Sequence, residues 1–305
     1  MTDKEKRISR KEFFKKSGVG LTGAIAFNAM GKSPIDLLGS TKKPAQTVVL
    51  GRSGIKVNPI GFGAARTMEP SLVKTAIDHG LNFLDTGRLY ARGNNEIMVG
   101  KVIKDIRKDV VIQSKIKVPV IARNKTVRPA SSIAGGLEDM LNESLKALQT
   151  DYIDIMLVHE TEDIREIQNE TVMEFLDSAK KNGIIRAHGF SFHCELEHIR
   201  YANSINFYDI IVNPFNHKGA YKHMLHGEER EWDQPQLAVE LKKAHDRGVG
   251  TVALKTCSAG PYSFNGEEAS FPGAIKWVLN NEFIDAVSAA MSNVDEIKAD
   301  CKALS

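Results

Sequence analysis

Residues 81–100 read L-N-F-L-D-T-G-R-L-Y-A-R-G-N-N-E-I-M-V-G, and their pattern changes halfway. The stretch opens with a short apolar run of the length expected for a buried strand, and a helical pattern begins near Asn94. Asp85 ends the strand, where a buried carboxylate is costly unless a cation or several hydrogen bonds pair with it. Tyr90 follows in the next loop. On this stretch alone two interpretations stay open: Asp85 caps a turn and Tyr90 packs over a loop, or both belong to a functional site.

The next two strand-like runs also end in residues that can carry chemistry. Residues 110–115 end in Lys115, and residues 152–159 end in His159. Each alone has an ordinary explanation, since strand-end lysines are often solvated and many histidines are structural. All four residues together suit one chemistry. An ammonium lowers the pKa of a nearby phenol from its usual value of about 10, an aspartate holds the lysine in place, and an imidazole orients a carbonyl oxygen.

The order and spacing of these residues resemble the aldo-keto reductase family, in which a strand–D-T-x-x-x-Y–helix motif, a strand-ending lysine and a strand-ending histidine form a catalytic tetrad. The resemblance assigns this tetrad to Asp85, Tyr90, Lys115 and His159. It extends over about residues 48–298 and includes V-L-G-R-S-G-I-K-V-N-P-I-G-F-G at 49–63, S-L-K-A-L-Q-T-D-Y-I-D at 144–154 and N-G-I-I-R-A-H-G-F-S at 182–191.

The resemblance implies an oxidoreductase that transfers a hydride between a nicotinamide cofactor, NADP or NAD, and a small carbonyl or alcohol substrate. Tyr90 would donate the proton as general acid, Lys115 steadied by Asp85 would lower the phenol pKa, and His159 would orient the substrate oxygen. A non-catalytic nicotinamide-binding barrel that senses redox state is the alternative, because the contacts that the family uses for the nicotinamide are incomplete in this sequence.

Those contacts are a Ser-Asn pair after the fifth strand and an amide side chain on the sixth, which hold the carboxamide in the family. Ser191 matches the serine, but Phe192 and His193 follow it where asparagine is expected. Asn213 or Asn216 could supply the amide. The sequence therefore matches the family only in part on this side of the site.

Two more residues are expected near the phosphates. Lys255, after the seventh strand, either approaches the pyrophosphate or is an ordinary solvated or helix-facing lysine. Ser292 lies at a helix start after the eighth strand, where its hydroxyl and the backbone amides could receive a phosphate. Asp295 and Glu296 stand there in place of a clear arginine, so NAD and NADP both stay open.

Beyond residue 45 the chain alternates strand and helix patterns, which favours an α/β fold with a parallel sheet. We predict a (β/α)8 TIM barrel in residues 46–305, with an N-terminal β-hairpin from residues 48–57 that the family resemblance places at the barrel floor. About 260 of the 305 residues remain for it, close to the roughly 250 of a single such barrel. The carboxyl ends of the barrel strands should bring the tetrad together.

Strands are expected near 60–63, 81–85, 110–115, 152–159, 184–191, 210–213, 250–255 and 285–289. Helices are expected near 71–79, 94–104, 132–148, 171–181, 195–203, 234–247, 273–280 and 295–301.

Composition excludes several other classes of protein. A formal charge of +3 and a hydrophobic content of 42% describe an ordinary soluble globular protein and give no reason to expect nucleic acid binding. The spacing of the three cysteines, Cys194, Cys257 and Cys301, indicates no metal framework.

The middle of the chain is rich in histidine, at positions 188, 193, 198, 217, 223 and 226. A metal site is disfavoured, because the first strand reads G-F-G-A-A and lacks the H-x-H of metal-dependent barrel hydrolases. Residues 217–233 are long for a loop after a barrel strand. They are expected either to shape the substrate pocket at the active-site rim or to form a simple surface insertion.

Residues 1–45 differ from the rest of the chain. A basic opening leads into S-R-K-E-F-F-K at 9–15, followed by a mildly apolar run at 18–30 that is too short for a stable membrane span but fits the apolar region of a signal peptide. The motif resembles the twin-arginine export signal, with Lys11 in place of the second arginine. We therefore predict a periplasmic or exported protein that meets the export machinery transiently. A basic tail on a cytoplasmic protein is the alternative.

Overall fold

The computed structural model describes residues 47–117, 120–122, 124–193, 195–222 and 227–303. The predicted export segment, residues 1–45, lies outside the described residues. So do Cys194, His223 and His226.

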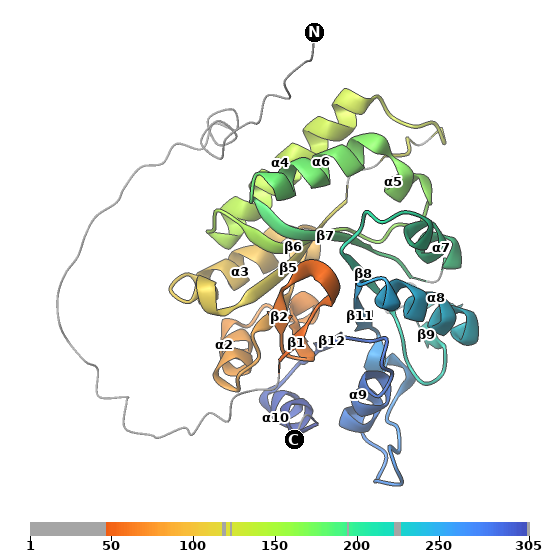
Figure 1. The fold of residues 1–305 in the computed structure, drawn as a ribbon. Helices are drawn as coiled ribbons and strands as arrows, with labels where there is room; N and C mark the ends of the chain where they lie inside the picture. Colours follow the sequence, from red (N-terminus) through yellow and green to blue (C-terminus); the bar gives the residue numbers. More distant parts are fainter. Residues whose placement is uncertain (1–46, 118–119, 123, 194, 223–226, 304–305) are drawn as a thin grey trace, which may run out of the picture.

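Eight parallel strands close into a barrel, in the spatial order β11-β12-β3-β4-β5-β6-β7-β8, with β11 paired to β8 (Figure 1). The predicted fold class is confirmed. The strands are β3 (Ile60–Gly63), β4 (Phe83–Asp85), β5 (Val111–Ile116), β6 (Ile153–Val158), β7 (Ile185–Ser191), β8 (Ile210–Pro214), β11 (Gly250–Leu254) and β12 (Ala286–Ala290).

Helices surround the barrel on its outside (Figure 1). They are α2 (Pro70–Asp78), α3 (Asn94–Ile103), α4 (Ala130–Leu148), α5 (Arg165–Gln168), α6 (Glu170–Lys181), α7 (Leu196–Ser204), α8 (Gln234–Asp246), α9 (Phe271–Leu279) and α10 (Val294–Lys302). In α4 the apolar residues Ile133, Leu137 and Leu141 recur every fourth position and are all buried, which is why this segment lies along the strands as a helix. The eight predicted helices are confirmed, and the short α5 is an addition.

The N-terminal hairpin pairs β1 (Val48–Val49) with β2 (Lys56–Val57) in antiparallel fashion. Leu50, Ile55 and Val57 are fully buried in one cluster with residues from the barrel interior, such as Ile210. The Arg52 amide also donates to the carbonyl of Gly248, just before β11 begins. The hairpin therefore closes the amino-terminal end of the barrel, as the sequence predicts.

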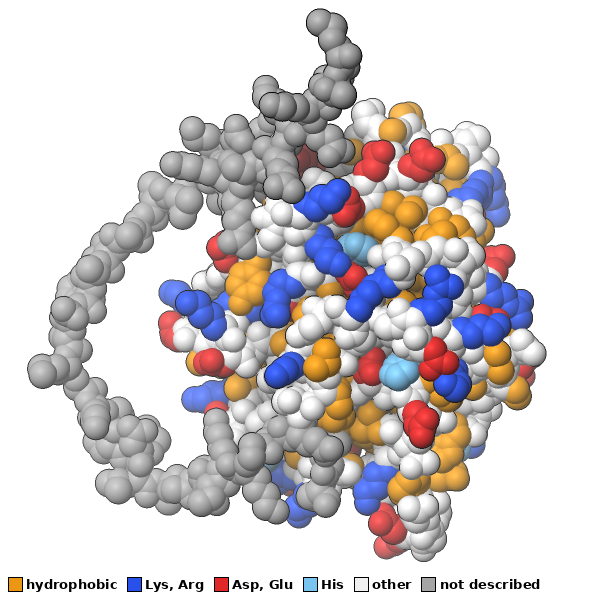
Figure 2. Space-filling model, in the orientation of Figure 1, with side chains coloured by type: hydrophobic (Ala, Val, Ile, Leu, Met, Phe, Trp, Pro, Cys, Tyr) orange, Lys and Arg blue, Asp and Glu red, His pale blue; other side chains and the backbone are white. Residues whose placement is uncertain are grey.

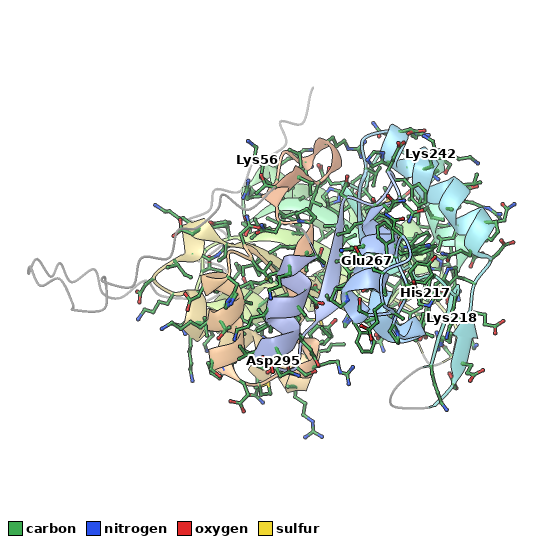
Figure 3. All side chains as sticks on the ribbon, turned by 90° about the horizontal axis from the view of Figure 1, so that it is seen from below. Lys56, His217, Lys218, Lys242, Glu267 and Asp295 are labelled. Atoms are coloured by element: carbon green, nitrogen blue, oxygen red, sulfur yellow. The ribbon has the colours of Figure 1, made fainter. Side chains whose placement is uncertain are left out.

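The opposite end of the barrel, formed by the carboxyl ends of the strands, is where the predicted site residues lie. Figure 3 shows Lys56 of the hairpin and Asp295 at the start of α10 at opposite ends of the molecule. Each helix of the barrel starts on the side where the preceding strand ends, so the strand carboxyl ends lie on the Asp295 side. On the hairpin face seen in Figure 2, acidic, basic and apolar side chains are interspersed.

The long segment after β8 contains a second hairpin that the sequence did not reveal. Strands β9 (Ala220–Lys222) and β10 (Glu229–Glu231) pair antiparallel, with Tyr221 opposite Arg230. Tyr221 and Trp232 are buried, so the segment packs on the barrel rather than standing away from it. Among the described residues, none of the helices has the length and apolar character that crossing a membrane requires.

Candidate active site

Strand β4 ends in Asp85, and the chain then follows the end of β5 toward Tyr90. The amide of Thr86 donates to the carbonyl of Gln113 at 2.8 Å, and the amide of Arg88 donates to the carbonyl of Lys115 at 2.9 Å. A 3₁₀ turn over Tyr90–Gly93 comes next, in which Ala91 and Arg92 have φ angles of 48° and 55°. This left-handed backbone is unfavourable for residues other than glycine and is typical of functional sites.

Asp85 and Lys115 form a buried ion pair at the barrel mouth. The Lys115 ammonium donates to Asp85 Oδ1 and, at 2.7 Å, to the Thr86 carbonyl. Gln113 Nε2 donates to Asp85 Oδ1 at 2.7 Å, and the Ser288 hydroxyl donates to Oδ2 at 2.8 Å. Burial opposes the positive charge of Lys115, but Asp85 and Tyr90 together outweigh it and raise the lysine pKa. The pair meets the condition for burying two charges, since both are hydrogen-bonded.

Tyr90 lies directly beside this ion pair. Lys115 Nζ is 4.8 Å from the centroid of the Tyr90 ring, and the imidazole of His159 meets the same ring edge-on at a centroid distance of 5.4 Å. All four predicted catalytic residues therefore converge at one end of the barrel. They come from the ends of β4, β5 and β6 and the loop after β4, as the fold requires.

The pKa of Tyr90 differs from the sequence-based expectation. Burial raises the pKa of the phenol, and Lys115 opposes that rise without cancelling it, because Asp85 acts against the lysine. Tyr90 is therefore protonated at neutral pH. This state suits a proton donor, which must carry its proton when the substrate arrives.

His159 is held in its neutral form. Burial, together with the nearby charges of Lys115 and Lys117, lowers its pKa to about 2. Its Nδ1 atom is buried and, within the described part of the chain, has no hydrogen-bond partner. A neutral imidazole can donate from one nitrogen to a substrate oxygen without adding a charge to the site.

A cavity of about 450 Å³ opens on this group. Asp85, Tyr90 and Ser288 line one part of it, and Ser292, Glu296 and Asp300 from the α10 region line another. Three cationic side chains, Arg66, Lys222 and Lys255, also line the cavity. Its three cationic side chains and its contact with Tyr90 fit a phosphate-bearing ligand such as a dinucleotide.

Comparison with known proteins agrees with this geometry. A model of the aldo/keto reductase family matches residues 59–302, which includes all eight barrel strands. The chain belongs to the aldo/keto reductase family. The uncharacterized oxidoreductase YqkF of Bacillus subtilis is 30% identical over 152 residues, which are 47% of this chain and 47% of YqkF. The chain thus spans about half the length of the curated relatives it matches.

Solved aldo-keto reductases share the fold. The holo form of AKR11C1 from Bacillus halodurans aligns with a TM-score of 0.69 and 22% identity over 85% of this chain and 91% of that one. A Klebsiella pneumoniae aldo/keto reductase, whose structure holds NADP and acetate, aligns with a TM-score of 0.62 and 20% identity over 85% of this chain and 89% of that one.

The residues predicted to hold the nicotinamide carboxamide differ in whether their side chains still have a hydrogen-bonding atom for it. Ser191 is buried, and its hydroxyl accepts a hydrogen bond from the Glu160 amide at 2.9 Å. Asn216 is fully engaged: its Nδ2 donates to the carbonyls of Ala220 and Lys255, and its Oδ1 accepts from the amides of Lys218 and Gly219. Asn216 thus organises the loop after β8.

Asn213 has one side-chain acceptor that is not hydrogen-bonded within the described part of the chain. It is fully buried, and its Nδ2 donates to the carbonyl of Pro214 at 3.0 Å. Its Oδ1 is buried and has no partner among the described residues. A buried acceptor without a donor is costly, so a ligand amide that donates to it would be stabilised. Of the two asparagines predicted for the carboxamide, Asn213 is therefore the one with an unpartnered acceptor, and neither of them lines the cavity.

Lys255 lines the cavity and is not a solvated lysine. Its ammonium lies 5.1 Å from the centroid of the Tyr221 ring, and burial lowers its pKa. Ser292 also lines the cavity, but its amide donates at 2.6 Å to the carboxylate of Glu296. The Glu296 carboxylate therefore accepts the hydrogen bond of a backbone amide that was predicted to bind a phosphate.

Ser288 and Gln113 hold the Asp85 carboxylate, and neither residue was predicted from the sequence. Both lie inside their strands and carry no motif of their own, so only the closure of the barrel brings them to Asp85. The histidine-rich region yields no metal site in the described part of the chain, where no three metal-binding side chains cluster. Cys257 and Cys301 are free thiols.

Proposed function

We propose that this protein is an NAD(P)-dependent aldo/keto reductase that interconverts small carbonyl compounds and alcohols. The observation that carries the proposal is the buried Asp85–Lys115 ion pair beneath Tyr90, with neutral His159 against the same phenol and a cavity open to it. When bound, the nicotinamide cofactor supplies or accepts the hydride.

In the reductive direction, the Tyr90 hydroxyl gives its proton to the substrate oxygen. The Lys115 ammonium, close to the ring, stabilises the phenolate that is left. Asp85 keeps that ammonium in position, and Ser288 and Gln113 keep Asp85 in position. His159 donates to the substrate oxygen from a neutral ring and thereby orients the carbonyl toward Tyr90.

The cofactor side of the site fits a nicotinamide dinucleotide. The unpartnered Oδ1 of Asn213 would accept from the carboxamide, and Lys255 with Arg66 would face the phosphates. The holoenzyme of the Klebsiella relative, which holds NADP, supports this class of cofactor.

The test is a fluorescence titration with NADH and NADPH, followed by turnover of a panel of aldehydes, ketones and sugars. Saturable binding of one cofactor and turnover of at least one carbonyl class are expected. Binding of a cofactor without turnover of any of the compounds would favour the non-catalytic redox-sensing barrel. The absence of binding to both cofactors would contradict the proposal.

We further propose that residues 1–45 direct export by the twin-arginine route and that the enzyme works in the periplasm. The motif at 9–15 and the apolar run after it support this location. The twin-arginine route carries folded proteins, which suits an enzyme that binds its nucleotide before leaving the cytoplasm.

A further inference from the structure

Glu160 follows His159 directly and projects at the barrel mouth. Its φ angle is +46°, in the left-handed region that side-chain-bearing residues rarely adopt. Two contacts hold this backbone: the Glu160 amide donates to the Ser191 hydroxyl at 2.9 Å, and Lys117 Nζ donates to the Glu160 carbonyl at 2.9 Å. The strained conformation is thus fixed from both sides, which directs the side chain of Glu160 back toward the site.

The Glu160 carboxylate lies between two histidines. Its Oε1 atom is 3.9 Å from His159 Nε2 and 3.5 Å from His193 Nε2. The side chain is 43% exposed, so a ligand entering the mouth can reach it. Because His159 Nδ1 is buried, Nε2 is the nitrogen on the side of Glu160, and a carbonyl oxygen bound there lies close to the carboxylate.

His193 and Tyr221 hold the carboxylate in place. The Tyr221 hydroxyl lies 2.6 Å from His193 Nδ1, and Tyr221 lines the cavity from β9. A phenol that donates to Nδ1 leaves the ring proton on Nε2, which faces Glu160. A carboxylate has about four acceptor positions, so Glu160 keeps acceptors for a ligand after this contact.

We propose that Glu160 is a specificity-determining residue that accepts a hydrogen bond from a hydroxyl group on the carbon next to the substrate carbonyl. With the carbonyl oxygen on His159 Nε2, that neighbouring carbon lies beside Glu160. A hydroxyl group there donates to the carboxylate, a methyl group makes no such bond, and a carboxylate group is repelled. The site therefore selects α-hydroxy carbonyl compounds over α-keto acids. This inference rests on the proposed reductase function.

Burial lowers the pKa of the His159 imidazole, and three lysines, Lys115, Lys117 and Lys255, also act on it and lower its pKa further, so the preference depends on direct contact with Glu160 and not on the net charge of the barrel mouth. The Lys117 ammonium donates a hydrogen bond to the Glu160 carbonyl. The Lys255 ammonium lies over the ring of Tyr221, and burial lowers the pKa of this lysine. The Glu160 carboxylate lies 3.9 Å from the substrate-orienting nitrogen, and an anionic group bound directly against it is repelled at this short distance.

The test compares glycolaldehyde, acetaldehyde and glyoxylate, which differ only in the group next to the aldehyde: hydroxymethyl, methyl and carboxylate. The full-length protein is assayed with its preferred cofactor at pH 7 and constant ionic strength. We expect kcat/KM to fall from glycolaldehyde to acetaldehyde to glyoxylate, with about tenfold between the first two, the scale of a hydrogen bond to a charged group.

Glu160→Gln should reduce the glycolaldehyde-to-glyoxylate ratio of kcat/KM by about tenfold or more. Acetaldehyde turnover and cofactor affinity should stay within a few-fold of the parent, which shows that the variant is folded. The matched control is Glu162→Gln, an exposed carboxylate two positions along the chain, and it should leave the ratio unchanged. Tyr221→Phe, which frees His193, should give an intermediate ratio.

Equal ratios in the parent and Glu160→Gln would overturn the inference while the proposed function stands. Preference of the parent for glyoxylate would overturn it as well. A parent that reduces none of the three aldehydes overturns the inference, and the wider carbonyl panel then decides whether the proposed function falls with it.

Discussion

The Ser288 hydroxyl donates a hydrogen bond of 2.8 Å to Asp85 Oδ2, across 203 positions of sequence. Ser288 lies on β12 and Asp85 at the end of β4, with β3 between them in the barrel wall. This hydrogen bond and the one from Gln113 hold the Asp85 carboxylate in the orientation that pairs it with Lys115. The position of the lysine beneath Tyr90 thus depends on side chains from opposite ends of the sequence.

Tyr90→Phe removes the proton donor and keeps the ring that packs beside Lys115. We expect turnover to fall by roughly 100-fold or more, the usual scale of general acid–base catalysis, with cofactor affinity nearly unchanged. Steady-state kinetics and fluorescence titration measure the two effects. Tyr152→Phe, at the opposite end of β6 from His159, is the control and should leave turnover unchanged. Turnover of Tyr90→Phe within a few-fold of the parent would exclude Tyr90 as the acid.

Lys115→Met leaves the Asp85 carboxylate buried without its cation. We expect the free energy of unfolding to fall by about 3–5 kcal/mol, the cost of breaking a buried ion pair, along with a loss of turnover. In the double variant Asp85→Asn/Lys115→Met no charge remains unpaired, so much of the stability should return while turnover stays lost. Urea denaturation of the parent, both single variants and the double variant measures the coupling. Strictly additive losses would show that the two side chains do not interact.

The neutral state of His159 makes stability depend on pH. An unfolded histidine titrates at about 6.5, whereas burial and the nearby lysines lower the pKa of folded His159 to about 2. Below pH 6.5 the unfolded chain therefore binds a proton that the folded chain does not, and stability falls as the pH drops toward 2. Between pH 7 and pH 5 we expect the parent to lose about 2 kcal/mol more than His159→Asn does. Urea denaturation at both pH values tests this, with the exposed His79→Asn as control. Equal losses in the parent and His159→Asn would contradict it.

Glu296 should disfavour the additional phosphate of NADPH. Its carboxylate accepts from the Ser292 amide and from Asn293 Nδ2, and it lines the cavity together with Asp300. Glu296→Gln keeps the helix cap and removes the charge. We expect the affinity for NADPH relative to NADH to rise about fivefold, the scale of one partly solvated charge pair near 4 Å. Fluorescence titration with both cofactors measures it, and Glu138→Gln on the exposed face of α4 is the control. An unchanged ratio would place the ribose phosphate elsewhere.

The export segment predicts the behaviour of a fusion protein. A reporter joined to residues 1–45 should reach the periplasm only in cells with an intact twin-arginine translocation system. Lys11→Arg should increase the exported fraction, because it restores the paired arginine, and Arg10→Ala should reduce it. Cell fractionation of the three fusions measures this. If neither substitution changes export, the segment is not this signal and the enzyme is cytoplasmic.

The positions of the barrel elements follow from local pattern, because strands and helices bury their apolar residues at different periods. The 3.6-residue period of α4 and the apolar run of β6 were each visible in the sequence alone. The site residues Asp85, Lys115 and His159 were visible for a related reason: a charged or polar residue at the end of a buried strand conflicts with its surroundings. The β9–β10 hairpin was missed, because its short strands carry no clear alternation.

The barrel, the four candidate catalytic residues and the family resemblance could be predicted from the sequence, since each depends on the order and spacing of residues along the chain. Which side chains hold those four residues in place became visible only in the folded barrel. Ser288 meets Asp85 because the barrel closes, and Glu160 meets His193 because the ends of β6 and β7 lie side by side. The pKa of Tyr90 was decided in the same way. Lys115 alone would lower it, but burial, which no local pattern measures, raises it.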